Sequence, residues 1–221
     1  MDFTENYFPG WLNLTALTLC LILHSVCLYS LVRSDTRSEG IFNRWLWCIF
    51  FTSLLWIMRA SVVSGLNMHL NGGVLMALMF GWRMSVIGMS LVVLLTAYFN
   101  GVLLVNLGTS MVLNAIVPAT LGYLFFLLCE AKLPRHFFIY VYVSSFFGTW
   151  FSTIVSGTVI AGILALSQAM RWDLLSNDFL PFYYLLGFSE AFLSTAMITL
   201  FVVYKPEWVY SFRDSRYLKG K

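Results

Sequence analysis

Charged side chains are scarce in this chain of 221 residues. Asp, Glu, Lys and Arg make up 10% of it, whereas a soluble domain carries about 25%. Hydrophobic residues make up 60%, and the mean hydropathy is +0.82. So little polar surface cannot cover a water-soluble globule, so lipid must be the solvent for most of the exterior. The net charge of +3 gathers on no basic face, and we expect no nucleic-acid partner.

Motifs for energy-driven or hydrolytic chemistry are also missing. The chain has no GxxxxGK[ST] sequence, so it cannot hold ATP in a P-loop. It has no HExxH or GxSxG sequence, and no nucleophile and base lie together within an apolar run. We therefore expect no enzyme, and any energy must come from an ion gradient or from separate ATPase subunits.

The four cysteines form no CxxC pair, and none lies near a histidine at metal-ligand spacing. Each lies in or beside an apolar run, which indicates a small apolar filler. We expect no permanently bound cofactor. The opening stretch, MDFTENYFPGW, carries Asp2 and Glu5 but no base, so we expect no cleaved signal peptide.

Apolar runs close to the 20 residues that a spanning helix needs recur along the chain. They predict an all-α integral membrane protein, one domain over residues 1–221 with a single bundle of about seven transmembrane helices. The sixth run is too long for one straight helix, so we expect tilt or a kink near Gly148. The expected spans are 11–32, 45–63, 66–82, 84–99, 110–129, 137–167 and 179–204, followed by a polar tail at 205–221.

The bases indicate the orientation. With seven spans the two termini lie on opposite sides of the membrane. Of the 13 Lys and Arg residues, only Arg59 and Arg171 fall on the side of the N-terminus. By the positive-inside rule, the N-terminus faces outward and the C-terminal tail is cytoplasmic.

Glu190 is the one carboxylate within an expected span. Such a group is costly in lipid and usually faces the protein interior with a partner. Glu190 is either part of an ion path or gate, or a buried strut between helices, and His24 or Arg59 could pair with it. His69 lies at the start of the short third span, with the polar Asn67 nearby. It is either a ligand or an ordinary interfacial residue.

Small residues repeat along the sixth span and let helices approach closely. They pack either against helices of the same chain or against another subunit. The expected packing face comprises Gly148, Ser152, Ser156, Gly157 and Ala161.

In order and spacing, four sequence blocks resemble the CbiM-type membrane subunits of energy-coupling-factor transporters, and most closely a bacterial branch classed only as permeases. The first is MDFTENYFPGW, and the second is HLNGGVLMALMFGW with His69. The third is LGTSMVLNAIVPATLGYLFF with Asn114, and the fourth is the G-x-x-E-A sequence around Glu190.

The resemblance implies capture of Co²⁺ or Ni²⁺ by an N-terminus that folds back into an outward pocket. The implied ligands are the Met1 amine, residue 2 and His69, while Asn67, Asn114 and Glu190 belong to the pocket or a gate. Asp2 stands where the family has a histidine, which leaves open a different divalent ion or a site that binds none. The implied location is the bacterial inner membrane. The implied partners, besides the lipid bilayer, are a scaffold membrane protein and cytoplasmic ATPases.

A second hypothesis also fits the sequence. The chain could be a membrane assembly or accessory protein that transports nothing and docks on another membrane complex through the small residues of the sixth span.

Overall fold

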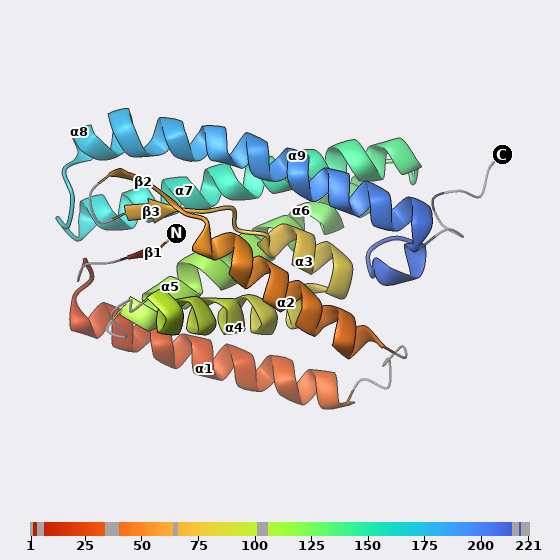
Figure 1. Cartoon of the computed structure of the whole chain (residues 1–221), viewed down its shortest axis with the longest axis horizontal. Helices are drawn as coiled ribbons and strands as arrows, with labels where there is room; N and C mark the ends of the chain where they lie inside the picture. Colours follow the sequence, from red (N-terminus) through yellow and green to blue (C-terminus); the bar gives the residue numbers. More distant parts are fainter. Residues whose placement is uncertain are drawn as a thin grey trace.

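Helices dominate the chain (Figure 1). The structure, a computed structural model, describes residues 2–3, 7–33, 40–63, 66–100, 106–213 and 217. The longer helices are α1 (Gly10–Arg33), α2 (Ile41–Ile57), α4 (Trp82–Asn100), α6 (Val117–Lys132), α7 (Gly148–Leu166) and α9 (Leu180–Tyr204). The short ones are α3 (Gly73–Phe80), α5 (Leu107–Met111), α8 (Trp172–Leu174), the π-helical η2 (Val112–Ile116), η3 (Ile139–Phe147) and η4 (Leu175–Phe179), and the 3₁₀ helix η5 (Pro206–Trp208).

Five continuous helical stretches are long and apolar enough to cross a membrane. They are Gly10–Arg33, Trp82–Phe99, Leu107–Lys132, Ile139–Leu166 and Trp172–Tyr204. The shorter α2 is also apolar. The chain is thus a multi-pass helical membrane protein. The count of seven spans and the outward N-terminus stay predictions.

The second and third apolar runs differ from the single helices that we expected. The second run is helical only to Ile57, and residues 60–63 form strand β2. The third run consists of strand β3 (Leu66–Met68), a loop, and α3, which has only eight residues. Gly72, with φ of +77°, directly precedes α3 in a left-handed conformation that interrupts a helix. Hydropathy alone could not reveal this, because a buried strand and a spanning helix are equally apolar.

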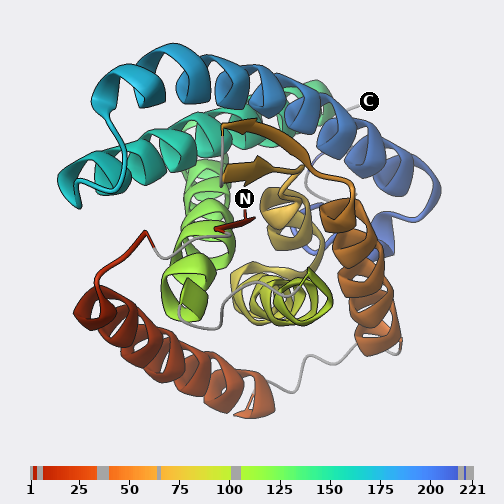
Figure 2. The same ribbon diagram turned by 60° about the vertical axis from the view of Figure 1, so that its left-hand side comes forward.

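The short helix α3 is the centre of the bundle. Figure 2 shows α3 and α4 inside a ring that α1, α2, α9, α7 and α6 form around them. Seven of its eight residues are buried, all but Leu75. Because neighbouring helices surround it, α3 can be apolar on every side.

The long sixth run is helical throughout, but its geometry changes where we expected a kink. The π-helical η3 ends at Phe147, and α7 begins at Gly148. Gly148 lies against the ring of Phe125 in α6, since a Cβ there would come within 3.1 Å of it.

Part of the polar tail expected at 205–221 packs against the bundle. Val209 and Phe212 are buried in the main hydrophobic core. The backbone N–H groups of Tyr210 and Ser211 donate to the Met79 and Leu78 carbonyls at 3.0 and 3.1 Å, at the C-terminal end of α3. A helix end needs such partners for its last carbonyls, which explains why a partly polar segment folds inward.

Candidate functional site

The N-terminal segment is folded back onto the molecule. Strand β1 (Asp2–Phe3) pairs antiparallel with β3, with Asp2 opposite Asn67 and Phe3 opposite Leu66. β2 pairs with the other edge of β3, which gives a three-stranded sheet in the order β1-β3-β2. The sheet lies at the end of the molecule where the N-terminus is drawn (Figure 1).

Phe8 anchors the next part of the segment. It is buried in a second hydrophobic cluster that also contains Leu66 and Met68 of β3 and Leu164 of α7. Phe8 thus fixes the chain to this end of the molecule just before α1. Met1 lies outside the described residues, and the description of Asp2 covers its backbone.

His69 directly follows β3 and is only 5% exposed. Its ring packs on the indole of Trp56, with the two ring centroids 3.9 Å apart. Its Nδ1 lies 3.2 Å from the Leu70 carbonyl oxygen. Trp56, in the last turn of α2, also donates its Nε1–H to the Asn71 carbonyl at 3.0 Å. One indole thus fixes both the ring of His69 and the loop that follows it.

Glu190 of α9 holds the same loop from the other side. It is 3% exposed, and its Oε1 accepts the Gly72 backbone N–H at 3.0 Å. The backbone N–H of Asn71 also donates to this carboxylate, and the Thr153 hydroxyl of α7 lies 3.4 Å from Oε2. A carboxylate at the N-terminus of a helix satisfies N–H groups that have no partner within the helix, and the helix macrodipole favours its charge.

Among the described residues, Glu190 bonds to the loop backbone and to Thr153 of α7. His24 of α1 instead bonds within its own helix, to the Cys20 carbonyl. In its contacts Glu190 is a strut between α9, α7 and the start of α3.

Asn71 ties the loop to the third family block. Its Nδ2 donates to the Asn114 carbonyl at 2.8 Å, and its Oδ1 accepts the Gly73 N–H at 2.9 Å. Pro118 lacks the N–H that would bond to the Asn114 carbonyl in a regular α-helix. The amide of Asn71 therefore donates to a carbonyl that cannot accept from position 118, and the site uses the backbone of Asn114.

Five of the expected site residues meet at one end of the molecule. His69, Asn67, Asn114, Glu190 and the backbone of Asp2 lie around one loop and one strand at the same end of the molecule. Within the described ranges, no three His, Cys, Asp or Glu side chains gather into a metal site. Sequence reasoning missed Trp56, Asn71 and Thr153 as supports of the loop. The only signal for them was the Asn-Gly-Gly sequence that directly precedes α3.

The small residues of the sixth span pack inside the chain. Gly148, Ser152, Ser156, Gly157 and Ala161 are all buried in α7. A Cβ at Gly157 would lie 2.3 Å from the Tyr183 ring of α9, and the Ser152 hydroxyl donates to the Pro118 carbonyl of α6 at 2.8 Å. These residues serve close helix packing within the bundle. These five residues therefore face the interior of the bundle.

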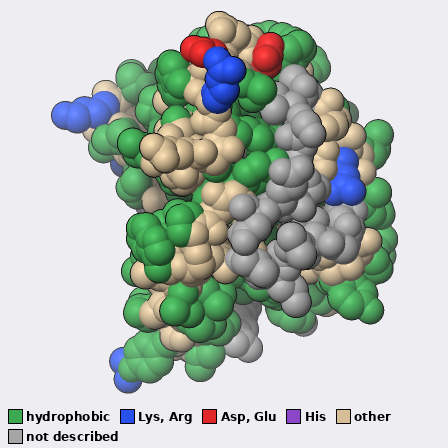
Figure 3. Space-filling model, turned by 90° about the vertical axis from the view of Figure 1, so that its left-hand side faces the viewer, with side chains coloured by type: hydrophobic (Ala, Val, Ile, Leu, Met, Phe, Trp, Pro, Cys, Tyr) green, Lys and Arg blue, Asp and Glu red, His purple; other side chains and the backbone are tan. Residues whose placement is uncertain are grey.

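Figure 3 views the end that carries the strands. Hydrophobic and uncharged side chains cover most of its described surface, and charged ones are few. Near this end, the exposed side chains of Arg171 and Asp173 form an ion pair of 3.1 Å.

Residues 3–208 match the model of a protein family described as CbiM, the cobalt uptake substrate-specific transmembrane region. One solved structure, a transition metal transporter, aligns over 100% of both chains with a TM-score of 0.78 and 16% identity. A truncated transition metal transporter covers 92% of this chain and 98% of its own, with a TM-score of 0.77 and 15% identity. These likenesses establish the fold. None of the curated proteins matches this chain.

Proposed function

The chain belongs to the CbiM family, the cobalt uptake substrate-specific transmembrane region, and from that premise we propose that it captures a divalent transition metal ion for uptake. The candidate ions are Co²⁺ and Ni²⁺. Capture takes place at the end of the molecule that carries β1, β3 and His69. The ion is the cargo of the protein and not a resident cofactor.

The pairing of β1 with β3 is the observation that carries this proposal. It puts the backbone of Asp2 opposite Asn67, two residues before His69. The N-terminal segment and the histidine are far apart in the sequence, and this pairing brings them to one place. The Met1 amine, Asp2 and His69 are the proposed ligands.

The chemistry of this ligand set fits a transition metal. Amine and imidazole nitrogens favour Co²⁺ and Ni²⁺, while a carboxylate oxygen at residue 2 adds a harder ligand. We therefore expect weaker discrimination against Zn²⁺ and Mn²⁺ than an all-nitrogen site gives.

Glu190, Asn71 and Trp56 are positioning residues in this proposal. Each bonds to the backbone of the loop after His69 or, as the amide of Asn71 does, links that loop to η2. They hold the imidazole in place before the ion arrives, and an organised ligand costs less entropy on binding.

Inward passage needs other proteins. The chain has no P-loop sequence, so energy from ATP must come from separate subunits. We propose an energy-coupling scaffold membrane protein and cytoplasmic ATPases as partners. Membership of a family of transporter components supports this, and no enzymatic role is proposed.

Isothermal titration of the purified full-length chain with Co²⁺, Ni²⁺, Zn²⁺ and Mn²⁺ tests the proposal. We expect binding of at least one ion by the wild type and a loss of at least tenfold in affinity for His69→Ala. His136→Ala is the matched control, because His136 is exposed and lies before η3, away from the sheet. Asp2→His should raise the affinity for Ni²⁺ and Co²⁺. The proposal fails if no ion binds, or if His69→Ala and His136→Ala behave alike.

A further inference from the structure

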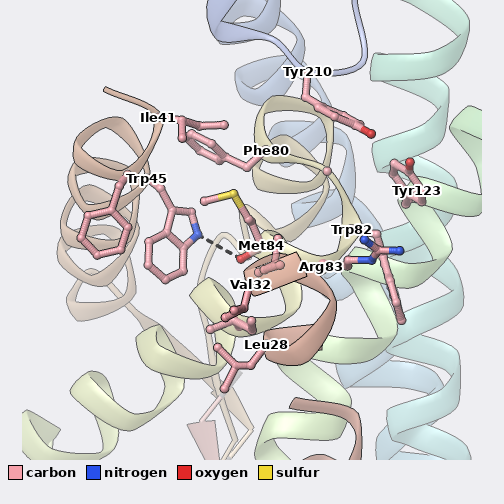
Figure 4. Close-up of a pocket in the computed structure, with 14 residues that line it drawn as sticks. Leu28, Val32, Ile41, Trp45, Phe80, Trp82, Arg83, Met84, Tyr123 and Tyr210 are labelled. Carbon is pink, nitrogen blue, oxygen red and sulfur yellow. Dashed lines mark hydrogen bonds between the residues drawn. The ribbon is translucent and has the colours of Figure 1, made fainter. Parts of the chain in front are cut away.

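A cavity of about 670 Å³ lies at the far end of the molecule from the sheet. It is bounded by the last turns of α1, the first turns of α2, and the junction of α3 with α4. Tyr123 of α6 and Tyr210 of the segment after α9 complete its wall (Figure 4). None of the residues proposed for metal capture lines it.

The cavity opens toward the surface that lipid covers. Leu28 and Val32 of α1 and Phe42 of α2 line it and are themselves exposed. α1 is the least buried of the candidate spans, with only 17% of its apolar window inside the protein. An acyl chain from the surrounding bilayer could therefore enter between α1 and α2 without passing through water.

The aromatic walls of the cavity are fixed in place. The Trp45 Nε1–H donates to the Met84 carbonyl at 2.9 Å, and the Trp82 Nε1–H donates to the Thr120 hydroxyl at 2.8 Å. With both indole donors occupied, the rings present apolar faces. Such a lining suits a hydrocarbon chain.

Arg83 is the one charged residue in the lining. It is exposed in the first turn of α4, and no acid or carbonyl among the described residues pairs with its guanidinium. A guanidinium binds phosphate through paired N–H groups, and a helix N-terminus favours an anion. In Figure 4 the Tyr123 and Tyr210 hydroxyls lie on the same side of the cavity as Arg83, and Trp45 lies on the other.

We propose that this cavity is a binding site for an anionic phospholipid. The phosphate binds Arg83, and one acyl chain lies in the gap between α1 and α2. An apolar cavity open to the bilayer, with an exposed arginine beside it, complements an amphiphile with a negative head and a hydrocarbon tail. This site goes beyond metal capture and does not depend on it.

Native mass spectrometry of the full chain, released from micelles with equal amounts of phosphatidylglycerol and phosphatidylcholine, tests the proposal. We expect the wild type to retain phosphatidylglycerol at least fivefold over phosphatidylcholine, and Arg83→Gln to abolish the preference. Arg171→Gln is the matched control, since it removes the same charge at the other end of the molecule and should keep the preference.

A second pair of variants tests the acyl-chain part of the site. Leu28→Trp fills the cavity and should lower total lipid retention at least threefold. Leu185→Trp adds the same ring at an exposed position of α9 outside the cavity and should not. Size-exclusion profiles and unaltered metal titrations check that all variants fold.

Three results would overturn the proposal. One is equal retention of both lipids by the wild type. Another is an unchanged preference in Arg83→Gln. The third is displacement of the lipid by soluble glycerol phosphate, which would indicate a site for free phosphate and not for a phospholipid.

Discussion

At the scale of single residues, the candidate metal site depends on buried polar groups that each satisfy a specific backbone atom. Glu190 accepts from the loop backbone, Asn71 serves the Asn114 carbonyl, and Trp56 serves the Asn71 carbonyl. Unpaired groups of this kind are costly away from water. Removing any one of these side chains should therefore affect both stability and the geometry around His69.

Replacement of Glu190 should show this most strongly. Glu190→Ala leaves two backbone N–H groups and the Thr153 hydroxyl with one acceptor fewer, at a cost of roughly 2–4 kcal/mol. Glu190→Gln keeps one acceptor oxygen and should cost about 1 kcal/mol. Thermal unfolding in detergent measures both. Glu207→Gln, at an exposed carboxylate after α9, is the control and should leave the melting temperature unchanged.

Replacement of Trp56 separates packing from hydrogen bonding. Trp56→Phe keeps an aromatic ring against His69 but removes the donor to the Asn71 carbonyl, a loss of about 1–2 kcal/mol. We expect metal affinity to fall severalfold, because the loop after His69 is less firmly held. Trp172→Phe, at an exposed position of α8, should change neither quantity. Equal effects of the two variants would contradict a positioning role for Trp56.

At the scale of secondary-structure elements, close helix packing is the main constraint. Two of the three glycines in α7 differ in how much space surrounds them. A Cβ at Gly157 would lie 2.3 Å from the Tyr183 ring, whereas a Cβ at Gly162 would have no atom within 4 Å. Replacement of these two glycines by alanine should therefore have opposite effects on the stability of the protein.

Gly157→Ala should destabilise the protein by roughly 1–3 kcal/mol, because the buried Tyr183 ring must move. Gly162→Ala should stabilise it by up to about 1 kcal/mol, because alanine favours a helix over glycine. Chemical or thermal unfolding of the two variants gives the comparison. A stabilising Gly157→Ala would mean that α7 and α9 are not packed as described.

Elements could be predicted from the sequence where charged or polar residues bounded an apolar run. The expected spans 11–32 and 84–99 agree closely with α1 and α4. The run 66–82 could not be read correctly, because a protein interior and a lipid exterior select the same apolar side chains. Its strand and short helix follow from tertiary partners, namely β1, Glu190 and the segment after α9.

The candidate site was predictable as a set of residues but not as an arrangement. The lone intramembrane carboxylate and His69 stand out by residue type alone. That Glu190 binds the backbone of the loop before α3 depends on how α9 and α3 meet, and no local sequence pattern encodes that.

At the scale of the whole molecule, the distribution of bases predicts which end faces the cytoplasm. The sheet end belongs with Arg59 and Arg171, and the opposite end with the other bases. Single cysteines at Asp173 and Glu207, both exposed, can report on the two ends.

A membrane-impermeant maleimide should label Asp173→Cys in intact cells, and should label Glu207→Cys only after permeabilisation. Three of the native cysteines are buried and Cys48 is partly buried. Labelling of the parent protein, which has only these cysteines, measures the background. The reverse labelling pattern would show the opposite orientation and would contradict the proposed capture of metal from outside.

α9 and the segment that follows it bond to both ends of the short helix α3. Glu190 of α9 binds the backbone just before its first residue, and Tyr210 and Ser211, soon after α9, bind its last carbonyls. Eight residues at 1.5 Å each make a rod of about 12 Å. Because α3 is held at both ends, we expect a displacement of the residues after α9 to shift the loop at Gly72 as well.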